Sequence, residues 1–114
     1  MTIEYIPDTG HIVWLSLDPQ RGREQGGHRP FLVLSPRRYN ARTSLIVGVP
    51  VTAKRKGYPF QVDLPADGSI DGVALADQLK SFDWRVRGVD HAQVVDPATL
   101  RDVRALIATF LDLR

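Results

Sequence analysis

A change of hydrophobic period near residue 96 constrains the fold of this chain more than any other feature. Before it, short runs of β-branched, aromatic and other apolar residues alternate with turns rich in glycine, proline and polar residues. After it, apolar residues recur at steps of three and four, which is the spacing of one helical face. The sequence therefore predicts a mainly β structure that ends in a single helix.

The candidate strands are all short and are separated by turn signals. They span residues 11–17, 31–34, 44–51, 60–64, 72–76 and 91–95. Prolines at 19 and 36 end the first two, because proline has no N–H to donate to a strand partner. We expect the glycine-rich stretch 20–27 to form a mobile exposed loop and residues 37–42 to form a short polar connection. Together these elements predict a small SH3-like barrel or curled antiparallel sheet.

The predicted helix begins with a strong start signal. Asp96 can cap the helix and Pro97 can occupy its first turn. An apolar stripe follows, formed by Leu100, Val103, Leu106, Ile107, Phe110 and Leu111. We expect this amphipathic helix to pack against the sheet. The chain shows no internal repeat or linker, so we expect residues 1–114 to form one domain.

Composition narrows the class of protein. The content of 43% apolar and 25% charged residues is ordinary for a folded domain of 114 residues. A domain this small leaves much of its surface exposed, so we expect a homodimer. The absence of cysteine excludes disulfides and thiolate metal sites. The sequence shows neither a signal peptide nor a membrane-spanning run, and we expect a cytoplasmic protein without membrane contacts.

The charges are distributed unevenly along the chain. The formal net charge is only +2, but residues 1–58 carry nine basic and four acidic residues, whereas the remainder carries six basic and nine acidic residues. This asymmetry indicates an anionic partner for the first half. The ordinary alternative is that these arginines are solvated loop residues.

The sequence carries none of the common catalytic signatures. There is no P-loop, no dinucleotide-binding glycine pattern, no nucleophile elbow and no His-x-x-x-His pair. The three histidines, His11, His28 and His91, are scattered along the chain, and we interpret them as surface or strand-end residues. We therefore expect neither a metal site nor a cofactor.

Two side chains could nevertheless bind a phosphate. Arg29 lies where the glycine-rich loop enters a strand, so its guanidinium could face a phosphate; alternatively, it pairs with Glu24 or Asp77. Thr52 places a hydroxyl beside the basic turn at 54–56, although a threonine at a strand end often only forms a turn. These residues alone leave both readings open.

A series of segments in fixed order carries a family resemblance. They are residues 5–10, 24–25, 27–30, 34–36, 39–40, 49–50, 52, 56–60, 71–78, 80–81 and 84–85. In this order they resemble the MazF/PemK toxins of type II toxin–antitoxin systems. The match runs over nearly the whole chain and is densest from Glu24 to Arg85.

The resemblance implies a function as well as a fold. It implies a homodimeric SH3-like toxin that cuts single-stranded RNA at a short sequence, without metal, and is neutralised by a MazE-like antitoxin with a disordered tail. The implied catalytic residues are Arg29, Thr52 and Glu24. The implied RNA-binding residues are Leu17, His28, Lys54, Lys56, Asp77, Gln78 and Lys80.

The chemistry expected of such a site is attack by the RNA 2′-hydroxyl on the adjacent phosphate, giving a 2′,3′-cyclic phosphate and a 5′-hydroxyl. Arg29 and Thr52 can donate hydrogen bonds to the developing charge, while Glu24, Arg29 or His28 could move protons. Leu17 and Ala53 stand where an aromatic residue and a second hydroxyl are familiar in the family, so we expect the RNA sequence recognised to differ.

Two other functions are compatible with the predicted fold. The first is a CcdB-like toxin that binds and poisons a topoisomerase without catalysis, because fold alone does not fix function. The second is a barrel that only binds nucleic acid, which would favour more exposed aromatic residues than this sequence offers. Arg29, Thr52 and the basic turn favour the RNA-cutting alternative.

Overall fold

The computed structural model describes residues 4–16, 28–65 and 68–113. In chain order the elements are β1 (His11–Ser16), β2 (His28–Val33), α1 (Arg37–Thr43), β3 (Leu45–Thr52), β4 (Gln61–Asp63), β5 (Val73–Leu75), β6 (Lys80–Asp83), α2 (Trp84–Arg87), β7 (Val89–Val94) and α3 (Pro97–Phe110). The predicted loop at 20–27, which includes Glu24, and Leu17 lie outside the described residues.

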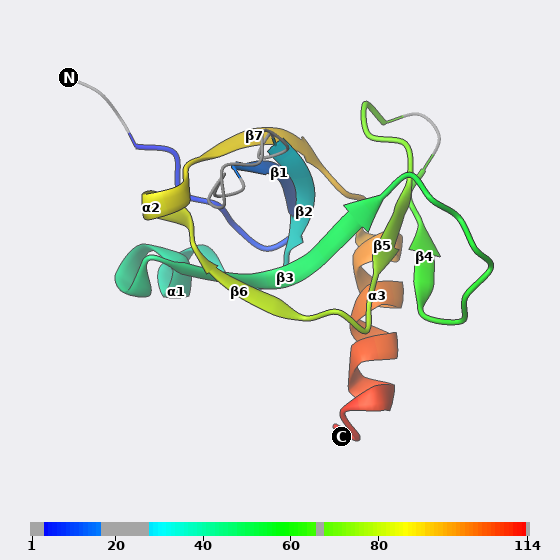
Figure 1. The fold of residues 1–114 in the computed structure, drawn as a ribbon. Coiled ribbons are helices and arrows are strands. Elements are labelled where there is room, and N and C mark those ends of the chain that lie inside the picture. Colours follow the sequence, from blue (N-terminus) through cyan, green and yellow to red (C-terminus); the bar gives the residue numbers. More distant parts are fainter. Residues whose placement is uncertain (1–3, 17–27, 66–67, 114) are drawn as a thin grey trace, which may run out of the picture.

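The strands form one seven-stranded sheet that curls on itself, and α3 packs beside β4 at one end of the sheet (Figure 1). The strand order is β4-β5-β3-β2-β1-β7, with β6 paired to the first half of β3. Each of these pairings is antiparallel. The predicted mainly β fold, a curled antiparallel sheet with a C-terminal helix, is confirmed.

Alternating side chains of the sheet supply two separate cores. Ile12 and Leu32 belong to the core that packs against α3, whose Val103 is also fully buried. Their sequence neighbours Val13 and Phe31 point to the other face, inside the curl. This alternation follows from the period of two along a strand, and it means that β1 and β2 hold the two cores together.

Helix α3 begins as predicted. The Asp96 carboxylate accepts a hydrogen bond from the Thr99 N–H at 3.3 Å, and Pro97 occupies the first turn. The apolar stripe is buried at Val103 and Ile107, but Phe110 and Leu111 at its far end are 37% and 45% exposed. Among the described residues, no helix combines the length and apolar character needed to cross a membrane.

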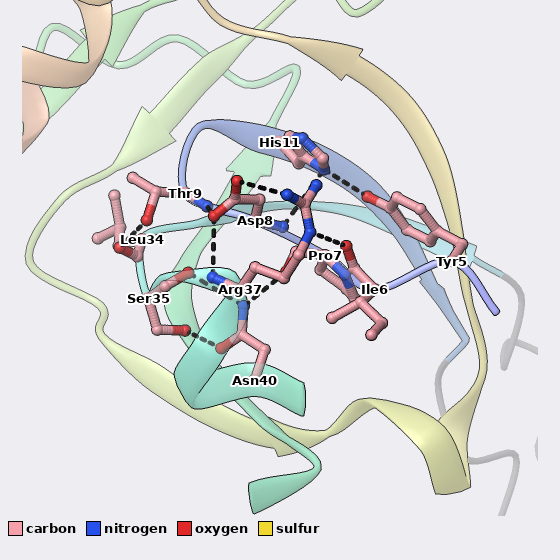
Figure 2. Close-up of polar contacts among 10 residues, drawn as sticks. All are labelled: Tyr5, Ile6, Pro7, Asp8, Thr9, His11, Leu34, Ser35, Arg37 and Asn40. Carbon is pink, nitrogen blue, oxygen red and sulfur yellow. Dashed lines mark hydrogen bonds and ion pairs between the residues drawn. The ribbon is translucent and has the colours of Figure 1, made fainter. Parts of the chain in front are cut away.

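The prediction of a polar connection at residues 37–42 is wrong, because this stretch forms α1. Its first N–H, on Arg37, donates to the Asp8 carboxylate at 2.9 Å, so the cap comes from 29 residues earlier in the chain. Asn40 is fully buried and its side-chain amide donates to the Pro7 and Ser35 carbonyls (Figure 2). Contacts this distant in sequence leave no local helix pattern.

β6 and α2 were not predicted from the sequence, and β2 begins three residues earlier than predicted. Asp83 joins the two missed elements, because its carboxylate accepts from the Val86 N–H at 3.1 Å and from the Ser44 hydroxyl at 2.7 Å. Trp84 is buried and donates its indole N–H to the Asn40 carbonyl at 2.9 Å. A four-residue strand and a four-residue helix are too short to produce a clear periodic pattern.

The histidines are less scattered in the structure than in the sequence. The rings of His11 and His91 meet edge to face with centroids 4.9 Å apart. The Tyr5 hydroxyl lies 2.7 Å from Nδ1 of His11, and the Asp8 N–H donates to the same nitrogen at 3.3 Å. Accepting these hydrogen bonds at Nδ1 requires a neutral His11 ring with its proton on Nε2.

This cluster predicts a pH-dependent stability. Burial, and then the charge of neighbouring His91, lower the pKa of His11 in the folded protein, with Arg37 acting in the same direction and Asp8 opposing it. Stability from this group is therefore fully present above the ordinary histidine pKa of about 6.5 and declines as the pH falls below it. Urea titrations between pH 8 and pH 5 should show a smaller loss of stability for His11→Asn than for wild type. Equal losses of stability in His11→Asn and wild type would contradict the prediction. The control is His28→Asn, which replaces an exposed histidine and should lose stability like wild type.

Candidate active site

The ends of β2 and β3 bring Arg29 and Thr52 together. The register pairs Phe31 with Pro50, so Arg29 and Thr52 each lie two residues further along toward the same end of the strands. Residues two apart along a strand share a face, and both side chains line the same depression. Two residues that are 23 positions apart in sequence therefore form one site.

The depression is open to solvent and has a volume of about 870 Å³. Its lining includes Trp14, which lies opposite Pro30 in the β1–β2 ladder. Its charged lining consists of Arg29, Lys54, Lys80 and Asp71. Three cations against one carboxylate make the depression suitable for an anion, and the aromatic ring offers a surface on which a base can stack.

The Thr52 hydroxyl oxygen accepts one hydrogen bond, and its proton remains available for a ligand. Its Oγ1 accepts from the Lys54 N–H at 3.3 Å, so Thr52 forms a turn at the end of its strand, as its sequence position allowed. The O–H is not used in that contact and can still donate to a ligand. The backbone behind Thr52 is closely packed, because a Cβ on Gly72 would lie 2.5 Å from the Thr52 carbonyl oxygen. Only glycine fits at position 72 without moving this strand.

A second depression of about 670 Å³ adjoins the first and shares Thr52, Lys54 and Gln78 with it. Lys56, Tyr58 and Asp77 line its other side. The Tyr58 hydroxyl donates to Asp77 at 2.7 Å, and this hydrogen bond raises the pKa of Tyr58. The two depressions form a continuous basic surface along the end of β3.

The alternative in which Arg29 pairs with Asp77 is wrong, since within the described residues the Asp77 carboxylate is engaged by Tyr58 and makes no ion pair. The other alternative partner, Glu24, lies outside the described residues, as does the RNA-binding candidate Leu17. Arg29 is exposed and lines the first depression.

The structure groups the remaining sequence-predicted site residues. His28, Arg29, Thr52, Lys54, Gln78 and Lys80 line the first depression, and Lys56 and Asp77 line the second. Trp14, Ser69 and Asp71 also line the first depression, and none of them was predicted as a site residue. The alternation of side chains along β1 could have identified Trp14, because it places Trp14 on the opposite face of the strand from Val13 and Leu15. Asp71 begins the family-like segment 71–78 but was not assigned a role there, and Ser69 carries no comparable signal.

No cluster of potential metal ligands marks the site. Across residues 4–16, 28–65 and 68–113, no three His, Asp or Glu side chains gather as they would around an ion. The charged lining of the depression instead offers guanidinium and ammonium groups, which can bind a phosphate directly.

Comparison with known proteins decides the family. The sequence pattern of the PemK-like, MazF-like toxins of type II toxin–antitoxin systems matches residues 8–111. The chain belongs to this family. The match includes β1 to α3 and therefore the whole strand framework of the site.

Individual family members agree with this assignment. The endoribonuclease toxin MazF of Escherichia coli K12 is 48% identical over 107 residues, which cover 94% of this chain and 96% of that protein. The endoribonuclease PemK of Escherichia coli is 36% identical over 110 residues, covering 91% and 81%. A MazE–MazF crystal structure from Deinococcus radiodurans matches with a TM-score of 0.93 and 47% identity, covering 97% of this chain and all of that chain.

Proposed function

We propose that this chain, an endoribonuclease toxin of the PemK and MazF family, cuts single-stranded RNA at a short sequence without a metal ion. The observation that carries the proposal is the placement of Arg29 and Thr52 on one face of adjacent strands, in a depression lined mainly by cations. The relatives named above are endoribonucleases, which favours RNA cleavage over a CcdB-like topoisomerase poison.

The proposed reaction uses the RNA as its own nucleophile. The 2′-oxygen attacks the adjacent phosphorus, the bond to the 5′-oxygen breaks, and the products are a 2′,3′-cyclic phosphate and a free 5′-hydroxyl. Charge builds on the non-bridging oxygens during attack. The Arg29 guanidinium and the Thr52 hydroxyl can donate to those oxygens, which stabilises the charge where it develops.

The reaction also needs two proton transfers. A base must take the proton of the 2′-hydroxyl, and an acid must protonate the leaving 5′-oxygen. His28 lies next to Arg29 at the start of β2 and lines the same depression. We assign these transfers to the set of Glu24, His28 and Arg29, in which a carboxylate or neutral imidazole suits the base and a cationic group suits the acid.

RNA binding is assigned to the surface that spans both depressions. Lys54, Lys56 and Lys80 are exposed and can contact successive phosphates. Asp77 and Gln78 carry the acceptors and donors needed to read base edges, and we include His28 and Leu17 among the RNA contacts. Contacts of this kind read unpaired bases, which is why we propose a single-stranded substrate.

Cleavage in the presence of a chelator tests the proposed function directly. Purified protein incubated with a mixed-sequence RNA and excess EDTA should cut at a recurring short sequence at the same rate as without EDTA, because Arg29 supplies the positive charge that a metal would otherwise provide. Mapping the cut ends gives the sequence recognised. A strict requirement for magnesium would contradict the metal-independent mechanism.

We also propose that the toxin is a homodimer. Light scattering of the purified protein checks this proposal.

We further propose that the acidic tail of an antitoxin neutralises the toxin. The solved complexes from Deinococcus radiodurans pair MazF with MazE, which supports a comparable partner for this chain. An acidic, disordered tail would be attracted to the basic surface that binds RNA. Saturating RNA should therefore weaken antitoxin binding in a competition assay, and independent binding would exclude overlapping sites.

A further inference from the structure

Arg55 connects three segments beside the proposed site. Its guanidinium lies 2.8 Å from the Asp71 carboxylate and 3.4 Å from that of Asp63. It also donates to the Gly72 carbonyl at 3.4 Å. Arg55 follows the end of β3, Asp63 ends β4, and Asp71 precedes β5, and these strands lie side by side (Figure 1).

The two carboxylates differ in their relation to the site. Asp71 lines the first depression together with Arg29 and Thr52, whereas Asp63 lines neither depression. The backbone next to Asp71 touches the strand that carries Thr52, because position 72 has room only for glycine against the Thr52 carbonyl. Asp71 therefore places a negative charge at the edge of the proposed phosphate-binding site, and it would repel a phosphate there unless neutralised.

We propose that Arg55 neutralises Asp71 and so keeps the phosphate-binding depression attractive to RNA. The proposal rests on the proposed RNA-cleaving function. Arg55 is thereby a positioning residue that acts through Asp71, while the catalytic donors remain Arg29 and Thr52. The proposal thus assigns a role in RNA binding to Arg55, although Arg55 itself lines neither depression.

The side chains of this ion-pair cluster are too exposed for it to contribute much to the stability of the fold. The side chains of Arg55, Asp63 and Asp71 are 43%, 77% and 79% exposed. Ion pairs this exposed contribute little to folding, since water screens them and ordering two long side chains has an entropic cost. Removing Arg55 should thus leave the thermal unfolding midpoint nearly unchanged and alter the binding of an anion beside Asp71.

The test is a set of charge variants that share the same Arg55→Ala background. At low salt, Arg55→Ala should raise KM for RNA about fivefold, the effect of one additional charge a few ångströms from a phosphate in a water-like dielectric. The change in kcat should stay within about twofold, because Arg29 and Thr52 are unaltered. Adding Asp71→Asn should restore the wild-type KM, whereas adding Asp63→Asn should not. The KM increase should shrink as salt screens the exposed charges.

Two measurements keep the inference separate from the proposed function. Arg38→Ala also removes one positive charge, but from α1, which precedes the start of β3. The proposed site lies at the other end of β3, where Thr52 is the last residue. This control should bind RNA like wild type. Affinity for a 2′-deoxy strand, measured by fluorescence anisotropy, reports binding without cleavage and should follow the same order of variants. If wild type cleaves no RNA, the proposed function fails and these affinities alone decide the inference. Equal impairment of Arg55→Ala and its Asp71→Asn double variant would overturn it, because Arg55 would then act by contacting RNA itself.

Discussion

Replacing Arg29 with alanine is expected to lower kcat for RNA cleavage about a hundred- to a thousandfold, the usual cost of removing one donor from the charge-stabilising group of a site. Thr52→Ala should cause a loss of the same kind, because the Thr52 hydroxyl has its proton free for a ligand. Both variants should fold normally, since Arg29 is exposed and Thr52 is only half-buried. Single-turnover cleavage of a short RNA measures the effect.

Conservative substitutions provide the controls for this prediction. Thr52→Ser keeps a hydroxyl and should retain most activity, whereas Thr52→Val keeps the shape without the hydroxyl and should behave like Thr52→Ala. Arg29→Lys keeps the charge but loses the planar pair of donors, so an intermediate activity is expected. Full activity of folded Arg29→Ala and Thr52→Ala proteins would place the catalytic site elsewhere.

A single 2′-deoxynucleotide immediately 5′ of the cut phosphate should abolish cleavage at that position. The proposed mechanism has no other nucleophile, because the 2′-oxygen attacks the phosphorus directly. Binding should change little, since the protein contacts proposed here are mainly with phosphates and bases. Cleavage is followed on a denaturing gel, and affinity by competition with the unmodified strand.

The same deoxynucleotide placed one position further from the cut is the matched control, and it should be cleaved like unmodified RNA. End analysis of the unmodified products should show a 2′,3′-cyclic phosphate. If the substituted strand is cut at the original position and rate, water is the nucleophile and the proton-transfer residues must be reassigned.

Much of the fold was predictable because its main elements carry strong local patterns. The apolar strands around Ile12, Leu32 and Val49 alternate as the two cores require, and α3 carries both its cap and its apolar stripe within one continuous stretch of the chain. The positions of the strand ends, and hence the pairing of Arg29 with Thr52, were not predictable from these patterns. They depend on the register between β2 and β3, which a sequence read segment by segment does not specify.

The residues that the prediction missed act across long sequence distances. Asp71 reaches the site because β5 pairs with the end of β3, and Trp14 reaches it through β1. His11 and His91 meet only because the first and last strands of the chain are neighbours in the sheet. Each of these contacts follows from topology, whereas the residues proposed to bind and cut RNA were already implied by the family resemblance.

The cap that Asp8 places on α1 makes this helix dependent on the start of the chain. Seven residues cannot hold a helix in water by themselves, and the Asn40 amide that anchors α1 donates to the carbonyl of Pro7. We therefore expect the segment around Pro7 and Asp8 to open and close together with α1, so that amide hydrogens of the helix exchange with solvent when this segment detaches. Because Trp84 donates to the Asn40 carbonyl, the same opening removes a partner from the core inside the curl.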